Sequence, residues 1–181
     1  MQRGTLFLVV GPSGAGKDSL LDAAKTALTN DPRFHFPRRL ITRPADAGGE
    51  NHIDVTAAEF ERLANNGQLL LAWRAHDLHY GIPDEVEDTL ANGQHAVVNV
   101  SRSVLDEARA RLQPVRVLSI HVPTEILRQR LVARGREKSG DVERRLQRAA
   151  AFEVAGRDVT TISNDADLET AIQRFLAALA A

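Results

Sequence analysis

Short apolar runs alternate along the chain with longer segments in which apolar residues recur at the spacing of one helical face. The apolar runs predict strands at residues 5–10, 38–42, 69–74, 95–100, 115–121 and 159–163. The longer segments predict helices at residues 17–28, 57–65, 83–91, 102–112, 124–134, 141–155 and 167–180. Because strands and helices that alternate in this way form parallel sheets covered by helices, we expect an α/β fold with a largely parallel sheet and helices on both faces.

A glycine-rich loop connects the first predicted strand directly to the first predicted helix. Between such elements, this loop type wraps backbone N–H groups around phosphates, and its lysine reaches the β- and γ-phosphates. We therefore expect a P-loop fold that binds a nucleoside triphosphate, rather than a glycine-rich turn of an ordinary α/β domain. The residues that make up this candidate site are Gly11, Pro12, Ser13, Gly14, Ala15, Gly16, Lys17, Asp18 and Ser19.

The residue after the loop lysine departs from the usual pattern. A P-loop lysine is normally followed by Ser or Thr, whose hydroxyl holds Mg²⁺, whereas this chain has Asp18. Like charges about 4 Å apart repel by roughly 1 kcal/mol in water and about 4 kcal/mol at an effective dielectric constant of 20. Because a cation between the carboxylate and the triphosphate removes this repulsion, the hypothesis is that Asp18 helps to hold Mg²⁺, with Ser19 as a second candidate. The alternative is an acidic residue that only favours the start of a helix.

Two segments interrupt the alternation of strands and helices. Residues 43–52 are polar and fit neither a strand nor a helix, and loops of this length often carry function. Residues 134–140 are charged, and further arginines lie on either side. In a phosphate-binding protein this second segment predicts an Arg-rich lid at about residues 134–145, because phosphoryl transfer needs positive charge and the exclusion of water. The alternative is a solvated helical hairpin whose arginines pair with Glu137, Asp141 and Glu143.

Composition narrows the class of protein. The 181 residues are 43% hydrophobic and 26% charged, which is ordinary for one globular domain. The chain has no cysteine, which excludes disulfides, thiolate metal sites and a cysteine nucleophile. A net charge of −1 gives no indication of a nucleic-acid partner. Neither a signal peptide nor a membrane span is evident, so we expect a cytoplasmic protein that binds small molecules.

The order of the remaining motifs resembles that of the guanylate kinase superfamily over almost the whole chain. These motifs are the P-loop, Ile41–Pro44, Gly48–Glu50, His52–Val55, Leu71–Trp73, Tyr80-Gly81, Arg134–Arg136, Arg145-Leu146 and Ser163–Asp165. The resemblance implies one domain over residues 1–181, with an acceptor-binding insertion at about residues 38–92. It also implies that Arg43 and Tyr80 hold the acceptor phosphate, that Arg134 and Arg145 are the arginines of the lid, and that Asn164 contacts the adenine of ATP.

Several departures from the guanylate kinase pattern concern the recognition of guanine. Ala72 stands before Trp73 where a glutamate is typical, and the end of the fourth long predicted strand reads Asn99-Val100-Ser101 in place of Asp-x-Asp. A site without these carboxylates leaves the polar groups of guanine unpaired and should discriminate poorly. We therefore expect a phosphorylated acceptor other than GMP.

The variant motifs are similar to those of the ribose 1,5-bisphosphate phosphokinases of bacterial phosphonate breakdown. They are Gly11–Leu21, Ile41–Pro44, Gly48–His52, Trp73–His76, Tyr80–Pro83, Asn99–Arg102 and Arg134–Glu137, with Asp77 and Val100 as small deviations. The resemblance implies Mg²⁺-dependent transfer of the γ-phosphoryl group of ATP to the 5-phosphate of ribose 1,5-bisphosphate, giving 5-phosphoribosyl 1-diphosphate and ADP.

Further residues are candidates for holding the acceptor. Arg102 is placed for its other phosphate, and Glu50, His52 and His76 could bond its ribose hydroxyls. Two alternatives remain: a divergent guanylate or other nucleoside monophosphate kinase, and an inactive binding module of guanylate kinase type. The loss of the guanine carboxylates argues against the first alternative, and the intact P-loop argues against the second. The sequence does not indicate an oligomeric state.

Overall fold

A computed structural model describes residues 2–134 and 139–181 of the chain. The described residues form two compact units, Met1–Phe7 with Asn30–Val115 (unit 1) and Leu8–Thr29 with Arg116–Ala181 (unit 2). The first strand, β1 (Leu6–Val10), passes from one unit to the other. Within the described residues, no helix is both long and apolar enough to cross a membrane.

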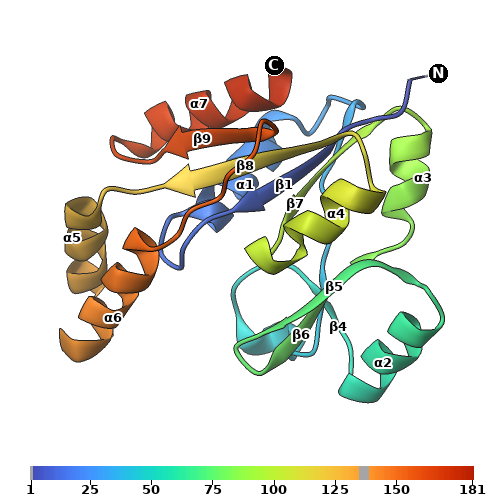
Figure 1. The fold of residues 1–181 in the computed structure, drawn as a ribbon, viewed down its shortest axis with the longest axis horizontal. Coiled ribbons are helices and arrows are strands. Elements are labelled where there is room, and N and C mark those ends of the chain that lie inside the picture. Colours follow the sequence, from blue (N-terminus) through green and yellow to red (C-terminus); the bar gives the residue numbers. More distant parts are fainter. Residues whose placement is uncertain (1, 135–138) are drawn as a thin grey trace. The chain divides into compact units, whose positions relative to one another are not determined.

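Unit 1 contains parallel and antiparallel strands (Figure 1). Strands β2 (Phe34–His35) and β7 (His95–Asn99) pair in parallel. A second sheet has the order β4-β3-β6-β5, built from β3 (Leu40–Ile41), β4 (Ile53–Asp54), β5 (Leu69–Ala75) and β6 (Leu78–Pro83). Strand β3 pairs in parallel with β4 and antiparallel with β6, while β5 and β6 form an antiparallel hairpin. This sheet carries most of the segment that the sequence predicts to be an acceptor-binding insertion.

Polar side chains cap two of the helical elements of unit 1, α2 and η2. Helix α2 (Ala57–Asn65) starts with a capping box, in which Thr56 and Glu59 exchange hydrogen bonds. The other helical elements are η1 (Ala45–Ala47), α3 (Val86–Ala91), η2 (Arg102–Val104) and α4 (Leu105–Arg111). Ser101 caps η2 by accepting a hydrogen bond from the Ser103 N–H.

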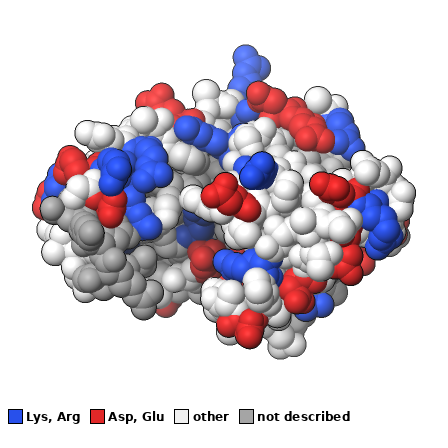
Figure 2. All heavy atoms as spheres, turned by 90° about the horizontal axis from the view of Figure 1, so that it is seen from below, with Lys and Arg blue, Asp and Glu red and all other residues white. Residues whose placement is uncertain are grey.

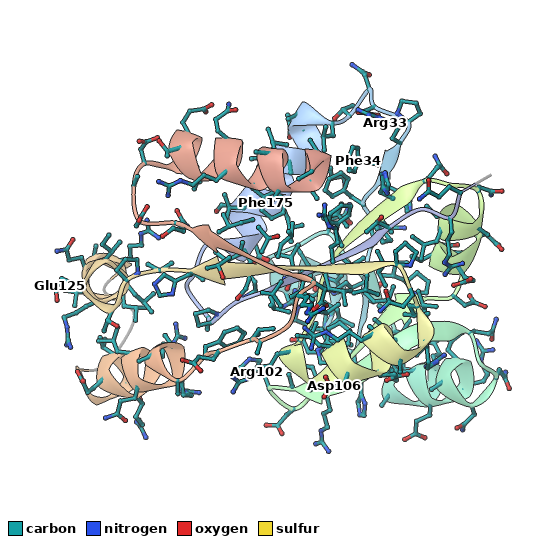
Figure 3. The ribbon with its side chains drawn as sticks, turned by 45° about the horizontal axis from the view of Figure 1, so that its top comes forward. Arg33, Phe34, Arg102, Asp106, Glu125 and Phe175 are labelled. Atoms are coloured by element: carbon teal, nitrogen blue, oxygen red, sulfur yellow. The ribbon has the colours of Figure 1, made fainter. Side chains whose placement is uncertain are left out.

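Unit 2 holds the glycine-rich loop and the C-terminal part of the chain. Its strands β8 (Val115–His121) and β9 (Val159–Ser163) pair in parallel, and its helices are α1 (Lys17–Ala27), α5 (Thr124–Arg134), α6 (Ser139–Ala150) and α7 (Leu168–Ala180). Helix α7 packs against α1 and buries Phe175 completely on its inner face (Figure 3). Helices α5 and α6 lie side by side (Figure 1).

The structure confirms the predicted α/β fold and corrects some of its elements. Three strands were not predicted: β2 and β4 are only two residues long, and β6 contains a glycine and a proline, which read as a turn. The helix predicted from residue 83 begins at Val86, because Pro83 is still paired in β6. The helix predicted to reach residue 155 ends at Ala150. The single domain over residues 1–181 stays a prediction.

Candidate nucleotide and acceptor sites

The glycine-rich loop of unit 2 leaves the start of α1 open to an anion. Gly16, the residue at the helix N-cap, adopts a φ of 87°, which is left-handed, and no side chain caps the helix. A residue with a side chain would be strained at this φ. A helix N-terminus behind a glycine-rich loop, without a capping side chain, is an arrangement that binds phosphates.

The charged residues of the loop surround this helix start. The Lys17 ammonium donates to the carbonyl oxygens of Gly11 (2.6 Å) and Pro12 (3.3 Å), so it folds back over its own loop. Asp18 and Ser19 are exposed in the first turn of α1. Carboxylate and hydroxyl oxygens are hard ligands of the kind that Mg²⁺ takes, together with phosphate oxygens, so the residues present fit this ion. Within the described residues, no group of three or more His, Asp and Glu side chains could hold a metal by itself.

Asn164 supports the loop from inside the protein. Its side chain is 4% exposed, and its amide nitrogen donates to the Ala15 carbonyl at 2.8 Å. A Cβ atom on Gly16 would lie only 2.6 Å from the same nitrogen. The structure thus directs the Asn164 amide at the backbone of the glycine-rich loop.

The residues beside Asn164 fix the end of β9. Arg174 of α7 donates to the Ser163 carbonyl (2.7 Å) and to the Asp165 carboxylate (2.6 Å). The bonds from Arg174 and from the Ser163 hydroxyl hold the pKa of Asp165 below its ordinary value. Arg174 thereby links α7 to the end of β9, next to Asn164.

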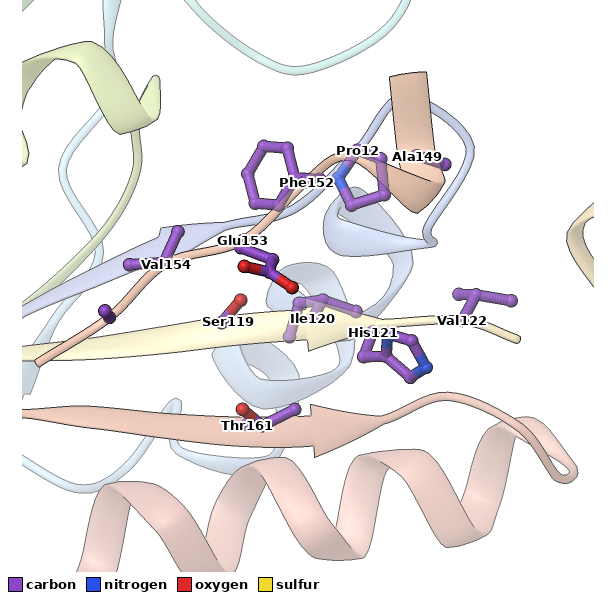
Figure 4. A pocket seen from close by; sticks show the side chains of 11 residues that line it. Pro12, Ser119, Ile120, His121, Val122, Ala149, Phe152, Glu153, Val154 and Thr161 are labelled. Carbon is purple, nitrogen blue, oxygen red and sulfur yellow. The ribbon is translucent and has the colours of Figure 1, made fainter. Parts of the chain in front are cut away.

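Unit 2 also contains a pocket of about 270 Å³ beside the loop residue Pro12. Pro12 and Phe152 lie close together at one side of this pocket, and Thr161 of β9 lies at the other (Figure 4). The Ser119 hydroxyl of β8 and the Glu153 carboxylate add polar groups to its lining. This pocket could not be predicted from the sequence, because residues 149–155 were expected in a helix and the other walls come from three separate segments.

The arginines predicted to form a lid lie on or next to α5 and α6. Residues 135–138 and the side chain of Arg134 lie outside the described residues. Arg128 of α5 pairs with Glu143 of α6 at 3.0 Å, and Arg144 pairs with Asp141. These two ion pairs are of the kind that the helical-hairpin alternative predicts. Arg145 is half-buried and has further interactions.

In unit 1, one face of the second sheet gathers the candidate acceptor residues. Trp73 of β5 lies opposite Tyr80 of β6, which lies opposite Ile41 of β3, so all three side chains share a face. The Trp73 and Tyr80 rings are stacked, with centroids 5.5 Å apart and planes 6° apart. Arg39 immediately precedes β3, and Arg43 lies just after it, where the chain bends at residues 42–43.

Arg39 lies over this aromatic pair and was not among the predicted site residues. Its guanidinium is 5.0 Å from the Tyr80 centroid and 5.9 Å from the Trp73 centroid. It binds the Glu50 carboxylate with two nitrogens, of which Nε donates at 2.8 Å, and Nη1 donates to the Asn99 carbonyl at 3.3 Å. The side chain of Arg39 is only 12% exposed and that of Glu50 is 26% exposed. The available signal was the pair of arginines, Arg39 and Arg43, on either side of the short apolar run.

Arg43 presents donors without a protein acceptor. Its Nε is buried, and no acceptor among the described residues bonds it. The guanidinium passes close to Gly49, where an added Cβ would lie 3.2 Å from a terminal nitrogen. A buried N–H group without a partner is costly, which makes Arg43 a candidate for binding a ligand oxyanion.

His52 holds the loop that surrounds Arg43. The ring is 4% exposed, and its nitrogens lie 2.8 Å from the Arg43 carbonyl and 3.1 Å from the Glu50 carbonyl. Both ring nitrogens are therefore engaged with the backbone of residues 43–50. This geometry favours a positioning role over a direct contact with a ligand.

The remaining predicted acceptor residues are exposed. His76 and Asp77 form the two-residue turn between β5 and β6, with φ of 52° and 60°. Such turns need residues that tolerate a left-handed backbone, and Asp is among those that do so. Arg102 and Asp106 lie on the outer side of η2 and α4 (Figure 3), and Arg102 has further interactions. Ala72 is exposed on β5, and Ser101 caps η2. Neither side chain carries a carboxylate, so the structure has no carboxylate at these two positions.

Charges of both signs are intermixed on the face shown in Figure 2, where the described Lys and Arg side chains lie among Asp and Glu side chains.

Known proteins similar to this chain were found by sequence and by structure. The guanylate kinase family model matches residues 3–181. The ribose 1,5-bisphosphate phosphokinase PhnN of Brucella melitensis is 43% identical over 174 residues, which are 96% of this chain and 91% of that protein. The protein of the same name in Thiobacillus denitrificans is 42% identical over 97% of this chain and 93% of that protein.

A second group of relatives is longer. The bifunctional ribose 1,5-bisphosphokinase-thymidine phosphorylase of Cupriavidus pinatubonensis is 44% identical over 98% of this chain, which spans only 29% of that protein. Among solved structures, a guanylate kinase from Anaplasma phagocytophilum superimposes with a TM-score of 0.69 over 99% of this chain and 86% of that chain, at 20% identity. The family match and the identities above 40% show that this chain belongs to the guanylate kinase family and is a homologue of the ribose 1,5-bisphosphate phosphokinases.

Proposed function

We propose that this chain is an ATP-dependent kinase that converts ribose 1,5-bisphosphate to 5-phosphoribosyl 1-diphosphate and ADP, in phosphonate breakdown. The observation that carries the proposal is the 43% identity to a curated ribose 1,5-bisphosphate phosphokinase over nearly the full length of both chains. The unpartnered Nε of Arg43 and the absence of a carboxylate at Ala72 and Ser101 support it.

The balance of atoms corrects the site of transfer given in the sequence analysis. The product carries a diphosphate on C1 and a single phosphate on C5. The new P–O bond must therefore form at an oxygen of the 1-phosphate, while the bond between the γ-phosphorus and the β–γ bridging oxygen of ATP breaks. Transfer to the 5-phosphate would give a different compound, with the diphosphate on C5. In this reaction the 5-phosphate remains unchanged.

The nucleotide end of the reaction uses unit 2. The loop amides and the open start of α1 would bind the β- and γ-phosphates, and Lys17 would exchange its loop carbonyls for phosphate oxygens. Asp18 and Ser19 would hold Mg²⁺, which neutralises charge on the phosphates when it is bound. Asn164 acts as a positioning residue, because its amide bonds the loop carbonyl of Ala15.

The acceptor end uses unit 1. Arg43 would bind the 1-phosphate through the donors that lack a protein partner, and Tyr80, which lies on the same sheet face as Ile41, would help to orient it. His76 and Arg102 remain candidates for contacts with the acceptor, while Glu50 is engaged with Arg39. Arg145 and Arg134 are proposed to add positive charge at the transferring group.

The acceptor needs no general base. A phosphate monoester has a second pKa near 6, so its oxygens are ionised at neutral pH. The residues contribute by positioning the two substrates and by neutralising charge. A reaction of this type should depend strongly on Arg43 and weakly on any single histidine.

An assay of ADP release with different acceptors tests the function. Ribose 1,5-bisphosphate should be the best acceptor, ahead of GMP and of no acceptor, and phosphorus NMR should detect a diphosphate on C1. Arg43→Gln should lower kcat/KM by about a hundredfold, since it removes a charge-assisted bidentate contact. Arg38→Gln, which removes the same charge from an exposed neighbour, should leave it unchanged.

Two results would contradict the proposal. GMP as the best acceptor would identify a guanylate kinase, and no turnover with any acceptor would favour an inactive binding module.

A further inference from the structure

A second arginine of unit 1 lies beside the proposed 1-phosphate ligand. Arg39 bonds the Glu50 carboxylate, and the Arg43 guanidinium lies close to the preceding residue, where a Cβ on Gly49 would be 3.2 Å from its terminal nitrogen. Two guanidinium groups thus lie at adjacent residues of one loop, which matches an acceptor that carries two phosphates.

The contacts of Arg39 leave donors available. Three of its five N–H groups bond the Glu50 carboxylate and the Asn99 carbonyl, and within the described residues the other two have no acceptor. The Tyr80 and Trp73 rings and the Asn99 carbonyl hold the guanidinium independently of Glu50. Arg39 would therefore keep its place if the carboxylate moved away.

We propose that Arg39 binds the 5-phosphate of the acceptor, the phosphate that is not transferred, and that this phosphate displaces Glu50 from the guanidinium. This inference rests on the proposed function. A carboxylate and a phosphate oxyanion fit the same planar fork, so Glu50 occupies the place of the phosphate when no acceptor is bound. A phosphate carries up to twice the charge of a carboxylate and competes well for the fork.

The loop that carries Glu50 allows this exchange. Glu50 follows Gly48 and Gly49, which have φ of 80° and 88°, and open space surrounds Gly48. The carboxylate is at the surface, so it can be hydrated when it leaves Arg39. His52 still holds the loop to the Arg43 carbonyl, which keeps the rest of the loop in place.

The assignment also explains acceptor selectivity. A guanidinium has donors only, so Arg39 pairs with oxyanions and not with the N–H groups of a guanine ring. The 5-phosphate would thus be recognised where a guanylate kinase needs carboxylates.

Calorimetric titration separates the two phosphates. Ribose 1,5-bisphosphate and ribose 1-phosphate, which lacks the 5-phosphate, would be titrated into the full chain with a non-hydrolysable ATP analogue present. The variants are Arg39→Gln, Arg39→Lys, Glu50→Gln and the double variant Arg39→Gln/Glu50→Gln, with Arg38→Gln as the matched control. Thermal unfolding verifies that each variant folds, and Arg39→Lys keeps the charge if Arg39→Gln does not fold.

Arg39→Gln should weaken binding of the bisphosphate at least about tenfold and that of ribose 1-phosphate less than about twofold. Arg39→Lys should lie between Arg39→Gln and the wild type, because it loses the bidentate fork. Glu50→Gln should tighten bisphosphate binding about two- to fivefold, since no carboxylate has to leave. The double variant should bind as weakly as Arg39→Gln, and Arg38→Gln should match the wild type.

Three outcomes overturn the inference. They are equal weakening of both ligands by Arg39→Gln, unchanged bisphosphate binding in that variant, and recovery of wild-type affinity in the double variant, which would limit Arg39 to neutralising Glu50. In each case the wild type still turns over the bisphosphate and the proposed function stands. A wild type that neither binds nor phosphorylates the bisphosphate refutes the function and this inference together.

Discussion

Replacement of Asn164 by alanine tests how the nucleotide loop is supported. The side chain is buried, and its amide donates to the Ala15 carbonyl at 2.8 Å. Asn164→Ala removes this donor. The carbonyl of Ala15, a fully buried residue, then lacks this hydrogen bond. If the bond fixes the loop, the variant should lose both stability and affinity for phosphates.

The structure gives the size of the effect. A buried acceptor that loses its hydrogen bond costs about 1–3 kcal/mol in the free energy of unfolding. For a chain of this size the loss should lower Tm by about 2–12 °C. Asn164→Asp should be more damaging than alanine, because its carboxylate would face the carbonyl oxygen with no donor.

Two ligands distinguish loop support from recognition of the adenine, the role expected from the family resemblance. ATP and inorganic tripolyphosphate share the phosphate chain, but only ATP has a base. Loop support predicts that Asn164→Ala weakens both ligands by the same factor in calorimetric titrations. Weaker binding of ATP with unchanged binding of tripolyphosphate would refute this reasoning and would place the side chain at the base.

Three further outcomes follow from the structure. Gly16→Ala should abolish nucleotide binding in a titration. The φ of residue 16 is 87°, and the added Cβ would lie 2.6 Å from the Asn164 side-chain nitrogen, so both the backbone and the packing oppose a side chain. Tight ATP binding by this variant would contradict the loop geometry. His52→Ala should lower the free energy of unfolding in urea by about 1–3 kcal/mol and raise the acceptor KM more than the ATP KM, since the ring holds the Arg43 loop; equal changes in the two KM values would remove its positioning role. Bonds from Arg3 at 2.6 and 2.7 Å lower the pKa of Glu87, so this pair stabilises the fold above about pH 4.5 and loses its effect as the pH falls through the lowered pKa. Glu87→Gln should therefore cost under about 1 kcal/mol at pH 7, and this cost should shrink as the pH falls below 4.5, as denaturation over that pH range would test.

The elements that local sequence patterns could predict are those with long runs. Helices α2 and α5 and strands β8 and β9 have the predicted bounds, because their periodicity extends over five or more residues. Strands β2 and β4 are too short to show any periodicity. In β6 the sequence Leu-His-Tyr-Gly-Ile-Pro carries two residues that usually end a strand, and only pairing with β5 and β3 reveals it.

Prediction of the sites was limited by contacts between distant residues. The P-loop could be recognised because its residues are contiguous. The amide of Asn164, however, bonds a residue 149 positions away, and no local pattern shows this orientation. The role of Arg39 likewise depends on Glu50 and Tyr80, which join it only when β3 pairs with β6. Family motifs indicated Arg43 and the surrounding loop, but they did not indicate Arg39, the second arginine of the proposed acceptor site.

The position of the loop lysine affects how inactive mutants should be interpreted. Substitution of the P-loop lysine, here Lys17, is a common way to make a kinase that is intended to fold normally but not to react. Here the same ammonium group braces two carbonyls of its own loop before any nucleotide arrives. A Lys17→Ala protein would therefore begin with a loosened backbone as well as a missing charge. Lost turnover in such a protein measures the two defects together, and Lys17→Arg, which retains donors for those carbonyls, is the better comparison.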